Sequence, residues 1–347
     1  MRSEKVRMIR VNERLRAGSG LVAFGRMRNA IWFCLGVAAL LVPVSSSAQT
    51  PAAKRPFHLV ANDASFWSLV PRDAKMQTMG TGFGFTEGPV WDKSGFLWVS
   101  DETLNKIFRL HPDGRREETI ALGDPDGNTY DRDHRLIDCA SVLRAIIRLS
   151  PDGKKYTILA GRYQGKRFNS PNDVVIGPDG AFYFTDPTLD LPKGEPQEIP
   201  YQGVYRLDKN GNVTLLTHDL EQPNGLAFSP DGNWLYIDDS AKKDIRVYRF
   251  HTDGTISDGR EFGDEAVAGE DGVPDGMRLD RAGNLYVVGP RGIWVWSPTG
   301  KHLGTIEVPE QPANLSWGGA DNSELFITAT TSVYRIKTSA RGFVPYE

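Results

Sequence analysis

Cysteine is nearly absent from the sequence, which contains only Cys34 and Cys139. Cys34 lies in a segment that we expect to be removed, and the single remaining thiol cannot form an internal disulfide. The fold must therefore be stabilised by its hydrophobic core rather than by cross-links, even in an oxidising compartment. We expect Cys139 to be a small buried hydrophobic residue rather than a nucleophile.

Several common catalytic signatures are also missing. The sequence has no G-x-S-x-G element of the usual serine hydrolases. It has neither a phosphate-binding glycine loop nor a dinucleotide fingerprint. The six histidines, at positions 58, 111, 134, 218, 251 and 302, all lie away from the strand starts described below. This placement disfavours a zinc site with the usual nitrogen and sulfur ligands.

Long apolar runs are missing except for Ala30–Val44, a stretch of 15 uncharged, mainly apolar residues. This run is short for a membrane span, follows two arginines and precedes small residues that end at Ala48. We therefore predict a secretory signal peptide over residues 1–48, with Met27 as a possible true start, and a periplasmic or secreted protein. An uncleaved membrane anchor is the alternative.

Positive charge is scarce once that segment is removed. Residues 1–48 contain eight Lys/Arg and two Asp/Glu, so the mature chain has 33 basic and 42 acidic residues. This balance disfavours nucleic acids and anionic membrane surfaces, which attract clustered positive charge. We expect a small-molecule substrate, no nucleic acid, and no membrane association after signal cleavage.

One strand pattern, in contrast, is abundant. A turn residue, alternating large apolar residues and often an Asp occur six times, at 94–101, 133–140, 179–186, 231–239, 282–289 and 322–330. The copies are 39 to 52 residues apart, which is typical of propeller blades. A further strand precedes each copy and another follows it, and a fourth follows the first five sets. Helical periodicity is nearly absent after residue 60.

These repeats predict an all-β fold, a six-bladed β-propeller of four-stranded blades over residues 74–347, after an N-terminal extension over 49–73. The sixth repeat has no fourth strand of its own. We expect the surplus segment Lys75–Phe85 to fill that place, so that an N-terminal strand closes the ring. An all-β sandwich is the alternative, but it would not explain six copies of the same strand triplet.

Polar residues at the starts of the first strands indicate a functional site. The first strand of each propeller blade lines the central channel, so these starts converge on the axis. They are Glu87-Gly-Pro, Asp126-Gly-Asn128, Pro171-Asn172-Asp173, Pro223-Asn224-Gly225, Pro274-Asp275-Gly276 and Pro312-Ala-Asn314.

Carboxylate and amide oxygens without His or Cys form a hard-ligand set. We predict one divalent cation, Ca²⁺ or Mg²⁺, with Mn²⁺ or Zn²⁺ as alternatives, whose charge Glu87 and Asp275 would balance. Taken singly, each Asn-Gly or Asp-Gly pair is also consistent with a simple turn. Glu87 is neither a turn residue nor a favoured strand residue, and the whole set favours a metal site.

Three aspartates, Asp101, Asp186 and Asp239, end second strands. They could reach toward the channel, but a role in the turns at the strand ends is the simpler interpretation.

The motifs FTEGPVW, GKRFNSPNDVV, QPNGLAFSPDGNWLYIDDS and VPDGMRLDRAGNLYV occur in this order. With them, roughly residues 80–337 resemble the gluconolactonase, regucalcin and luciferin-regenerating enzyme family. The resemblance implies a six-bladed propeller with one divalent metal, usually calcium, on its axis and hydrolysis of sugar lactones. It also implies that Glu87, Asn224 and Asp275 are metal ligands, and that Asn172 lies beside the metal and contacts it or the substrate.

The resemblance extends to the substrate. Arg167 resembles a substrate-contacting arginine, Asn128 is a further candidate for substrate binding, and Leu189–Tyr201 corresponds to a variable loop over the site. One segment departs from the pattern. Close relatives often have Cys-Glu-His followed by Gly and Arg, whereas this chain has Cys139-Ala140-Ser141 and then Val-Leu-Arg144. The metal ligands are unaffected, but the substrate is put in doubt.

We therefore predict a calcium-dependent lactonase that opens sugar lactones such as gluconolactone to the aldonic acid. Asp275 would be both a metal ligand and the base that activates water. Two alternatives remain open at this point. One is an esterase or phosphotriesterase that uses the same metal site. The other is a non-catalytic, ligand-binding propeller in which calcium serves only the structure.

Overall fold

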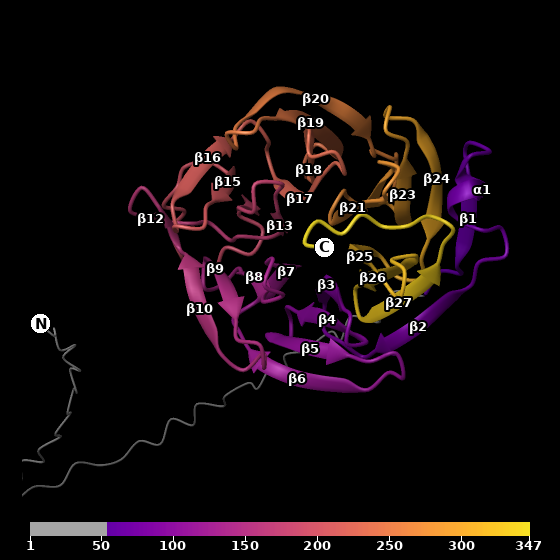
Figure 1. The fold of residues 1–347 in the computed structure, drawn as a ribbon, viewed down its shortest axis with the longest axis horizontal. Coiled ribbons are helices and arrows are strands. Elements are labelled where there is room, and N and C mark those ends of the chain that lie inside the picture. The colour runs from indigo at the N-terminus through magenta and orange to yellow at the C-terminus, as the bar shows by residue number, and fades with distance from the viewer. Residues whose placement is uncertain (1–53) are drawn as a thin grey trace, which may run out of the picture. The chain divides into compact units, whose positions relative to one another are not determined.

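The computed structural model describes residues 54–347, in which six antiparallel sheets of four or five strands surround one axis (Figure 1). The only helix in this part of the chain is the single turn α1 (Phe66–Leu69). The predicted six-bladed, all-β propeller is confirmed. The predicted signal peptide, including Met27 and Cys34, lies outside the described residues.

In each blade the strands follow one another from the axis outward. Blade 1 comprises β3 (Thr86–Asp92), β4 (Phe96–Asp101), β5 (Lys106–Leu110) and β6 (Arg116–Ala121). Blade 2 comprises β7 (Pro125–Tyr130), β8 (Leu136–Ala140), β9 (Ala145–Leu149) and β10 (Tyr156–Ala160). Blade 3 comprises β13 (Val174–Ile176), β14 (Phe182–Asp186), β15 (Gly203–Leu207) and β16 (Val213–Thr217), after a hairpin of β11 (Arg162–Tyr163) and β12 (Lys166–Arg167).

The second half of the ring repeats this order. Blade 4 comprises β17 (Pro223–Phe228), β18 (Trp234–Asp239), β19 (Asp244–Phe250) and β20 (Ile256–Asp264). Blade 5 comprises β21 (Met277–Leu279), β22 (Leu285–Gly289), β23 (Gly292–Trp296) and β24 (His302–Glu307). Blade 6 takes β25 (Pro312–Gly318), β26 (Glu324–Ala329) and β27 (Ser332–Lys337) from the end of the chain.

An N-terminal strand closes the ring as predicted. Strand β2 (Met76–Thr81) lies antiparallel to β27 and completes blade 6. Strand β1 (His58–Ala61), which the repeats do not predict, pairs with β24 and adds a fifth strand to the outside of blade 5. Part of the predicted N-terminal extension therefore covers a sheet edge that would otherwise be free.

Alternation along the second strands builds the core between blades. On β4, Leu97 and Val99 pack toward blade 6, where they meet Phe326. Trp98 points the other way, packs toward blade 2 and donates its indole N–H to the Tyr130 hydroxyl at 2.6 Å. Each blade thus buries apolar residues on both faces, and the ring holds its inner strands at fixed positions.

The aspartates that end second strands support the entries to the first strands. Asp101 accepts the backbone N–H of Gly84 at 2.8 Å, Asp186 that of Asn169 at 2.9 Å, and Asp239 that of Glu221 at 2.7 Å. Their carboxylates are thus used in the loops that lead to the axis, in agreement with the simpler interpretation.

The C-terminal residues 342–347 cross the ring at one end of the channel (Figure 1). The Phe343 N–H donates to the Leu279 carbonyl at 2.9 Å, and the ring of Tyr346 packs edge-on against Tyr130 with centroids 5.3 Å apart. Leu279 and Tyr130 are the last residues of inner strands, so the tail covers the end of the channel that is opposite the strand starts. Among residues 54–347, no helix has the length and apolar character needed to cross a membrane.

Candidate metal centre

One residue at the start of each inner strand stands at an equivalent place around the axis. Backbone contacts align four of the six blades with the next one, because the glycine after Glu87, Asp126, Asn224 or Asp275 touches the corresponding residue of the next blade. Gly127 donates its N–H to the Asn172 carbonyl at 2.8 Å, and Gly276 donates to the Ala313 carbonyl at 2.9 Å. We call this set the axial ring: Glu87, Asp126, Asn172, Asn224, Asp275 and Ala313.

The glycines beside the axial ring allow close approach between blades. A Cβ at Gly88 would lie 2.1 Å from the carbonyl oxygen of Asp126, and one at Gly225 would lie 2.1 Å from that of Asp275. Both distances are far inside van der Waals contact, so only glycine fits. Asn224 and Gly225 lie within strand β17, and a hairpin turn is therefore not the reason for this pair.

Several oxygen atoms of the axial ring accept no hydrogen bond. Asn172 uses its amide Nδ2 to donate to Asp126 at 2.7 Å, and Asn224 uses its Nδ2 to donate to the Ser240 hydroxyl at 3.2 Å. Glu87 accepts the Gly88 N–H at 2.7 Å through Oε2. Within the described chain, no hydrogen bond reaches Glu87 Oε1, either amide Oδ1 or the Asp275 carboxylate.

Burial and mutual repulsion disfavour the charged forms of the ring carboxylates. Burial raises the pKa of Glu87 to about 8, although hydrogen bonds from Gly88 and Asn314 oppose the shift. The pKa of Asp275 is held well above its usual range by burial first and by the charge of Glu87 next. Burial likewise raises the pKa of Asp126, helped by Glu102. A cation among these groups would reverse the shifts.

This donor set fits a divalent cation. The free atoms are carboxylate and amide oxygens, the ligands that Ca²⁺ and Mg²⁺ prefer. Glu87, Asn172, Asn224 and Asp275 come from four different blades, so folding of the whole ring is needed to assemble them. Their roles as ligands stay a prediction, but each residue carries a free oxygen at the axial ring.

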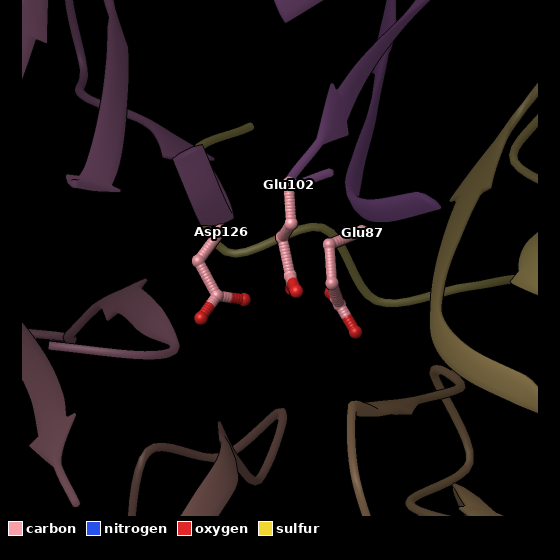
Figure 2. Close-up of side chains that lie close together, drawn as sticks. All are labelled: Glu87, Glu102 and Asp126. Carbon is pink, nitrogen blue, oxygen red and sulfur yellow. The ribbon is translucent and has the colours of Figure 1, made fainter. Parts of the chain in front are cut away.

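Sequence reasoning missed Glu102. Its carboxylate lies with those of Glu87 and Asp126 in a group whose ligand atoms are within 4.8 Å of one another, and all three converge on one space (Figure 2). Glu102 is half-buried and directly follows the second strand β4. The residues at the same place in blades 2 and 4 are Ser141 and Ser240, which also contact the ring. A polar residue directly after a second strand is thus the sequence signal for Glu102.

Two predicted substrate-binding residues have other contacts. Asn128 is fully buried and donates to the Gly88 carbonyl at 2.9 Å and to the Ser100 hydroxyl at 2.7 Å, so it joins blades 1 and 2. Arg167 lies on the outer hairpin strand β12 and pairs with Glu195 at 3.0 Å. Substrate contact by either residue stays a prediction, and neither position adds support to it.

The predicted loop Leu189–Tyr201 is tied to the segment that departs from the family pattern. Arg144, which is fully buried, donates to the Pro196 carbonyl at 3.3 Å and lies 3.4 Å from Glu195. Asp190 of the loop contributes to the raised pKa of Glu102 and of Asp275, which places its charge near the axial ring. The loop therefore adds acidic character to the open end of the channel.

Known proteins match this chain over most of its length. Residues 85–331 match the model of the SMP-30/Gluconolactonase/LRE-like region. The gluconolactonase of Zymomonas mobilis is 34% identical over 295 residues, which are 77% of this chain and 82% of that protein. The pentonolactonase of Haloferax volcanii is 27% identical over 252 residues, 70% of this chain and 80% of that protein.

A solved structure shows the same architecture. The gluconolactonase of Xanthomonas campestris superposes with a TM-score of 0.76 at 32% identity, covering 82% of this chain and 96% of that one. The extent of these matches shows that this chain belongs to the SMP-30/gluconolactonase/LRE-like family.

Proposed function

We propose that this protein is a lactonase that hydrolyses sugar lactones, such as gluconolactone, to the aldonic acid. The observation that carries the proposal is the axial ring, where four residues predicted as ligands present free oxygens at the end of the channel that the C-terminal tail leaves uncovered. The sugar-lactone class is supported by the lactonases to which the chain is similar.

In the proposed mechanism, Glu87, Asn172, Asn224 and Asp275 would hold one divalent cation, with Ca²⁺ the best match to an all-oxygen set. When bound there, such a cation supplies Lewis-acid polarisation of the lactone carbonyl.

Asp275 is the proposed base. Its carboxylate accepts no hydrogen bond from the described residues, so it is free to orient water and to accept its proton as the new C–O bond forms. The proton then goes to the ring oxygen when the acyl–oxygen bond breaks, so one water is consumed and a hydroxy acid is released. Burial of the ring, with Glu87, Asn172 and Asn224 all less than a tenth exposed, limits competing water.

Hydrolysis of a substrate panel tests the proposal. Gluconolactone, a pentonolactone, an aryl ester and a phosphotriester would be assayed with added calcium and with chelator. We expect calcium-dependent turnover of the lactones. A preference for the ester or phosphotriester would favour the alternative hydrolases, and no turnover of any of them would favour a binding protein.

The variant Asp275→Ala tests the residue assignment. We expect loss of both turnover and tight calcium binding, since one side chain is proposed for both roles. Asp113→Ala, in the exposed turn between β5 and β6, is the matched control and should behave like the unaltered protein. Full activity of Asp275→Ala would refute the assignment.

We also propose export to the periplasm or medium, because Ala30–Val44 is typical of the apolar part of a signal peptide. Sequencing the N-terminus of the protein from fractionated cells checks this. A start near Gln49 in the exported fraction is the expected result, and an intact N-terminus in the cytoplasm would contradict it.

A further inference from the structure

An arginine recurs just before the last apolar residue of the third strand. It is present in five of the six blades, as Arg109, Arg148, Arg206, Arg249 and Arg335. Each arginine pairs in the strand register with one residue of the second strand. These facing residues are Trp98, Ile137, Tyr183, Trp234 and Phe326. Blade 2 is thus the exception, because the arginine there faces an aliphatic residue.

Four of the five arginines have a partner. Arg109 lies over the ring of Trp98, 4.6 Å from its centroid, and Arg249 lies 5.6 Å from the centroid of Trp234. Such cation–π contacts stabilise the guanidinium group. The other two form ion pairs. Arg206 contacts Asp179 at 2.7 Å, and Arg335 contacts Glu324 at 3.6 Å.

The Arg148 side chain has no hydrogen bond, ion pair or aromatic partner within residues 54–347. It faces Ile137 where Arg109 faces Trp98, so the stacking surface is lost. It is half-buried and cannot be dismissed as a fully solvated surface charge. A half-buried guanidinium group that has no hydrogen-bond acceptor or opposite charge beside it can bind an anion with its N–H donors.

A cavity of about 280 Å³ lies beside Arg148 at the interface of blades 2 and 3. Leu159, Phe182 and Leu207 are apolar residues of its lining, and the exposed Lys209 also lines it. The turns at 131–135 and 177–181, which follow the inner strands β7 and β13, also line it. The cavity is therefore at the end of the blades away from the axial ring.

The charges around the cavity favour a monoanion. Three carboxylates line it, but all are engaged. Asp131 and Asp133 pair with Arg135 at 2.7 and 2.6 Å, and Asp208 accepts the N–H groups of its own turn. Arg148 and exposed Lys209 have no acidic partner in the described chain. Arg132, which donates to the Pro178 carbonyl at 3.2 Å, is a third cation of the lining without an acidic partner. These three cations attract a carboxylate, whereas the three nearby carboxylates would repel a ligand of higher charge.

We propose that this cavity is a second small-molecule site, which binds a monoanionic carboxylate with an apolar body. Arg148 would form the bidentate contact that guanidinium makes with carboxylate. The apolar body would lie on Phe182 and Leu159, as is usual for sites that combine an apolar wall with a few polar anchors. The site is separate from the axial ring, and the inference does not depend on the proposed lactonase activity.

Binding of 4-isopropylbenzoate tests the proposal by calorimetry and ligand-observed NMR. Its amide, 4-isopropylbenzamide, has the same body without the charge, and acetate has the charge without the body. We expect the benzoate to bind at least about tenfold more tightly than either probe, because both parts of the site are used. Binding should be equal with calcium and with chelator, since the axial ring is not involved.

Two matched variants locate the site. Arg148→Gln should weaken binding of the benzoate about tenfold or more. Arg249→Gln, at the same place in blade 4, removes an exposed arginine of the same repeat and should leave binding unchanged. A circular dichroism spectrum and melting temperature for each variant ensure that both remain folded.

Four results would overturn the proposal. The first is the absence of binding up to 10 mM of the benzoate. The second is equal binding of the benzoate and the amide, and the third is unchanged affinity in Arg148→Gln, since either would show that the guanidinium is not the anchor. The fourth is binding that disappears with chelator, which would assign the ligand to the axial ring.

Discussion

Asparagines at the inner strand starts fall into two groups that the structure uses in opposite ways. In blades 3 and 4, Asn172 and Asn224 stand in the axial ring, where their amide nitrogens are anchored and their oxygens are free. In blade 2, Asn128 lies two residues after the axial-ring residue Asp126, and in blade 6, Asn314 lies one residue after Ala313. Asn314 donates to Glu87 at 2.8 Å, and its own oxygen accepts the Leu315 N–H at 2.8 Å. A small offset thus turns a candidate ligand into a support for its neighbours.

The difference follows from strand geometry. Successive residues of a strand point in opposite directions, so a shift of one residue changes what a side chain faces. β-Bulges interrupt the pairing of first and second strands between Pro125 and Asn128 and between Pro223 and Leu226. The ring residue is freed from the sheet at such a bulge, while the residue beyond it returns to the space between blades. Ring side chains should therefore affect binding, and supporting side chains should affect stability.

Asp186 is the supporting carboxylate for which the largest effect is expected. Burial raises its pKa to about 8, so the folded protein retains a proton that the unfolded chain releases near pH 4. The free energy of unfolding should fall as the pH rises from about 4 to 8, by up to about 1.4 kcal/mol per pH unit from this group.

Urea unfolding of the unaltered protein and of Asp186→Asn, at pH 5 to 9 with saturating calcium, measures this slope. The difference in unfolding free energy between the two should shift in favour of the variant toward pH 8 and then level off. A difference that does not change with pH would mean that Asp186 is charged in the folded protein.

Asn128→Ala should have the next largest effect, on stability. The amide donates to the Gly88 carbonyl and the Ser100 hydroxyl in a fully buried place, so its removal leaves unpaired acceptors and a small cavity. We expect a loss of about 3 kcal/mol in the unfolding free energy of the metal-free protein. Calcium affinity, measured by calorimetry, should change by less than about threefold. A large loss of affinity with normal stability would place Asn128 among the ligands.

Asn224→Ala should show the opposite behaviour. It removes a proposed ligand oxygen, and calcium affinity should fall by about 10- to 100-fold. The metal-free protein should lose less than about 1 kcal/mol, because the side chain makes one long hydrogen bond, to Ser240. Glu102→Gln is the companion variant. Glu102→Gln should weaken calcium binding by no more than about threefold if the Glu102 side chain acts only through its charge and is not a ligand. A larger loss in Glu102→Gln than in Asn224→Ala would favour the acidic group of Figure 2 as the metal site.

Most of the fold could be predicted from the sequence because the same strand triplet occurs six times with period-two alternation. The closing strand β2 was also predictable, since the sixth repeat lacked an outer strand. Strand β1 and the C-terminal tail belong to no repeat. They find their places only by contacts with distant residues, such as Val60 opposite Thr305 and Tyr346 against Tyr130.

The site was predictable only in part. Glu87, Asn172, Asn224 and Asp275 share a position next to Pro or Gly in the sequence, and they share the axial ring in the structure. Asn128 has the same local sequence signal, but the bulge in β7 places its amide between blades. Glu102 carries no signal in a comparison of first strands, because it follows a second strand. Its approach to Glu87 and Asp126 depends on how the end of β4 packs against the first strands β3 and β7.

Two serines at second-strand ends provide the finest test of the difference between side chains that serve metal binding and side chains that serve stability. Ser240 donates to the Pro274 carbonyl at 2.7 Å and accepts from Asn224, while Ser141 donates to the Pro171 carbonyl at 2.7 Å and lies 3.3 Å from Asp126. Each alanine variant should lose about 1 kcal/mol of stability through the lost bond to proline. Only Ser240→Ala should weaken calcium binding, by a few-fold, because only Ser240 orients a proposed ligand. Calorimetric titration of both variants measures this difference, and a greater loss of affinity in Ser141→Ala would bring Asp126 into the ligand set in place of Asn224.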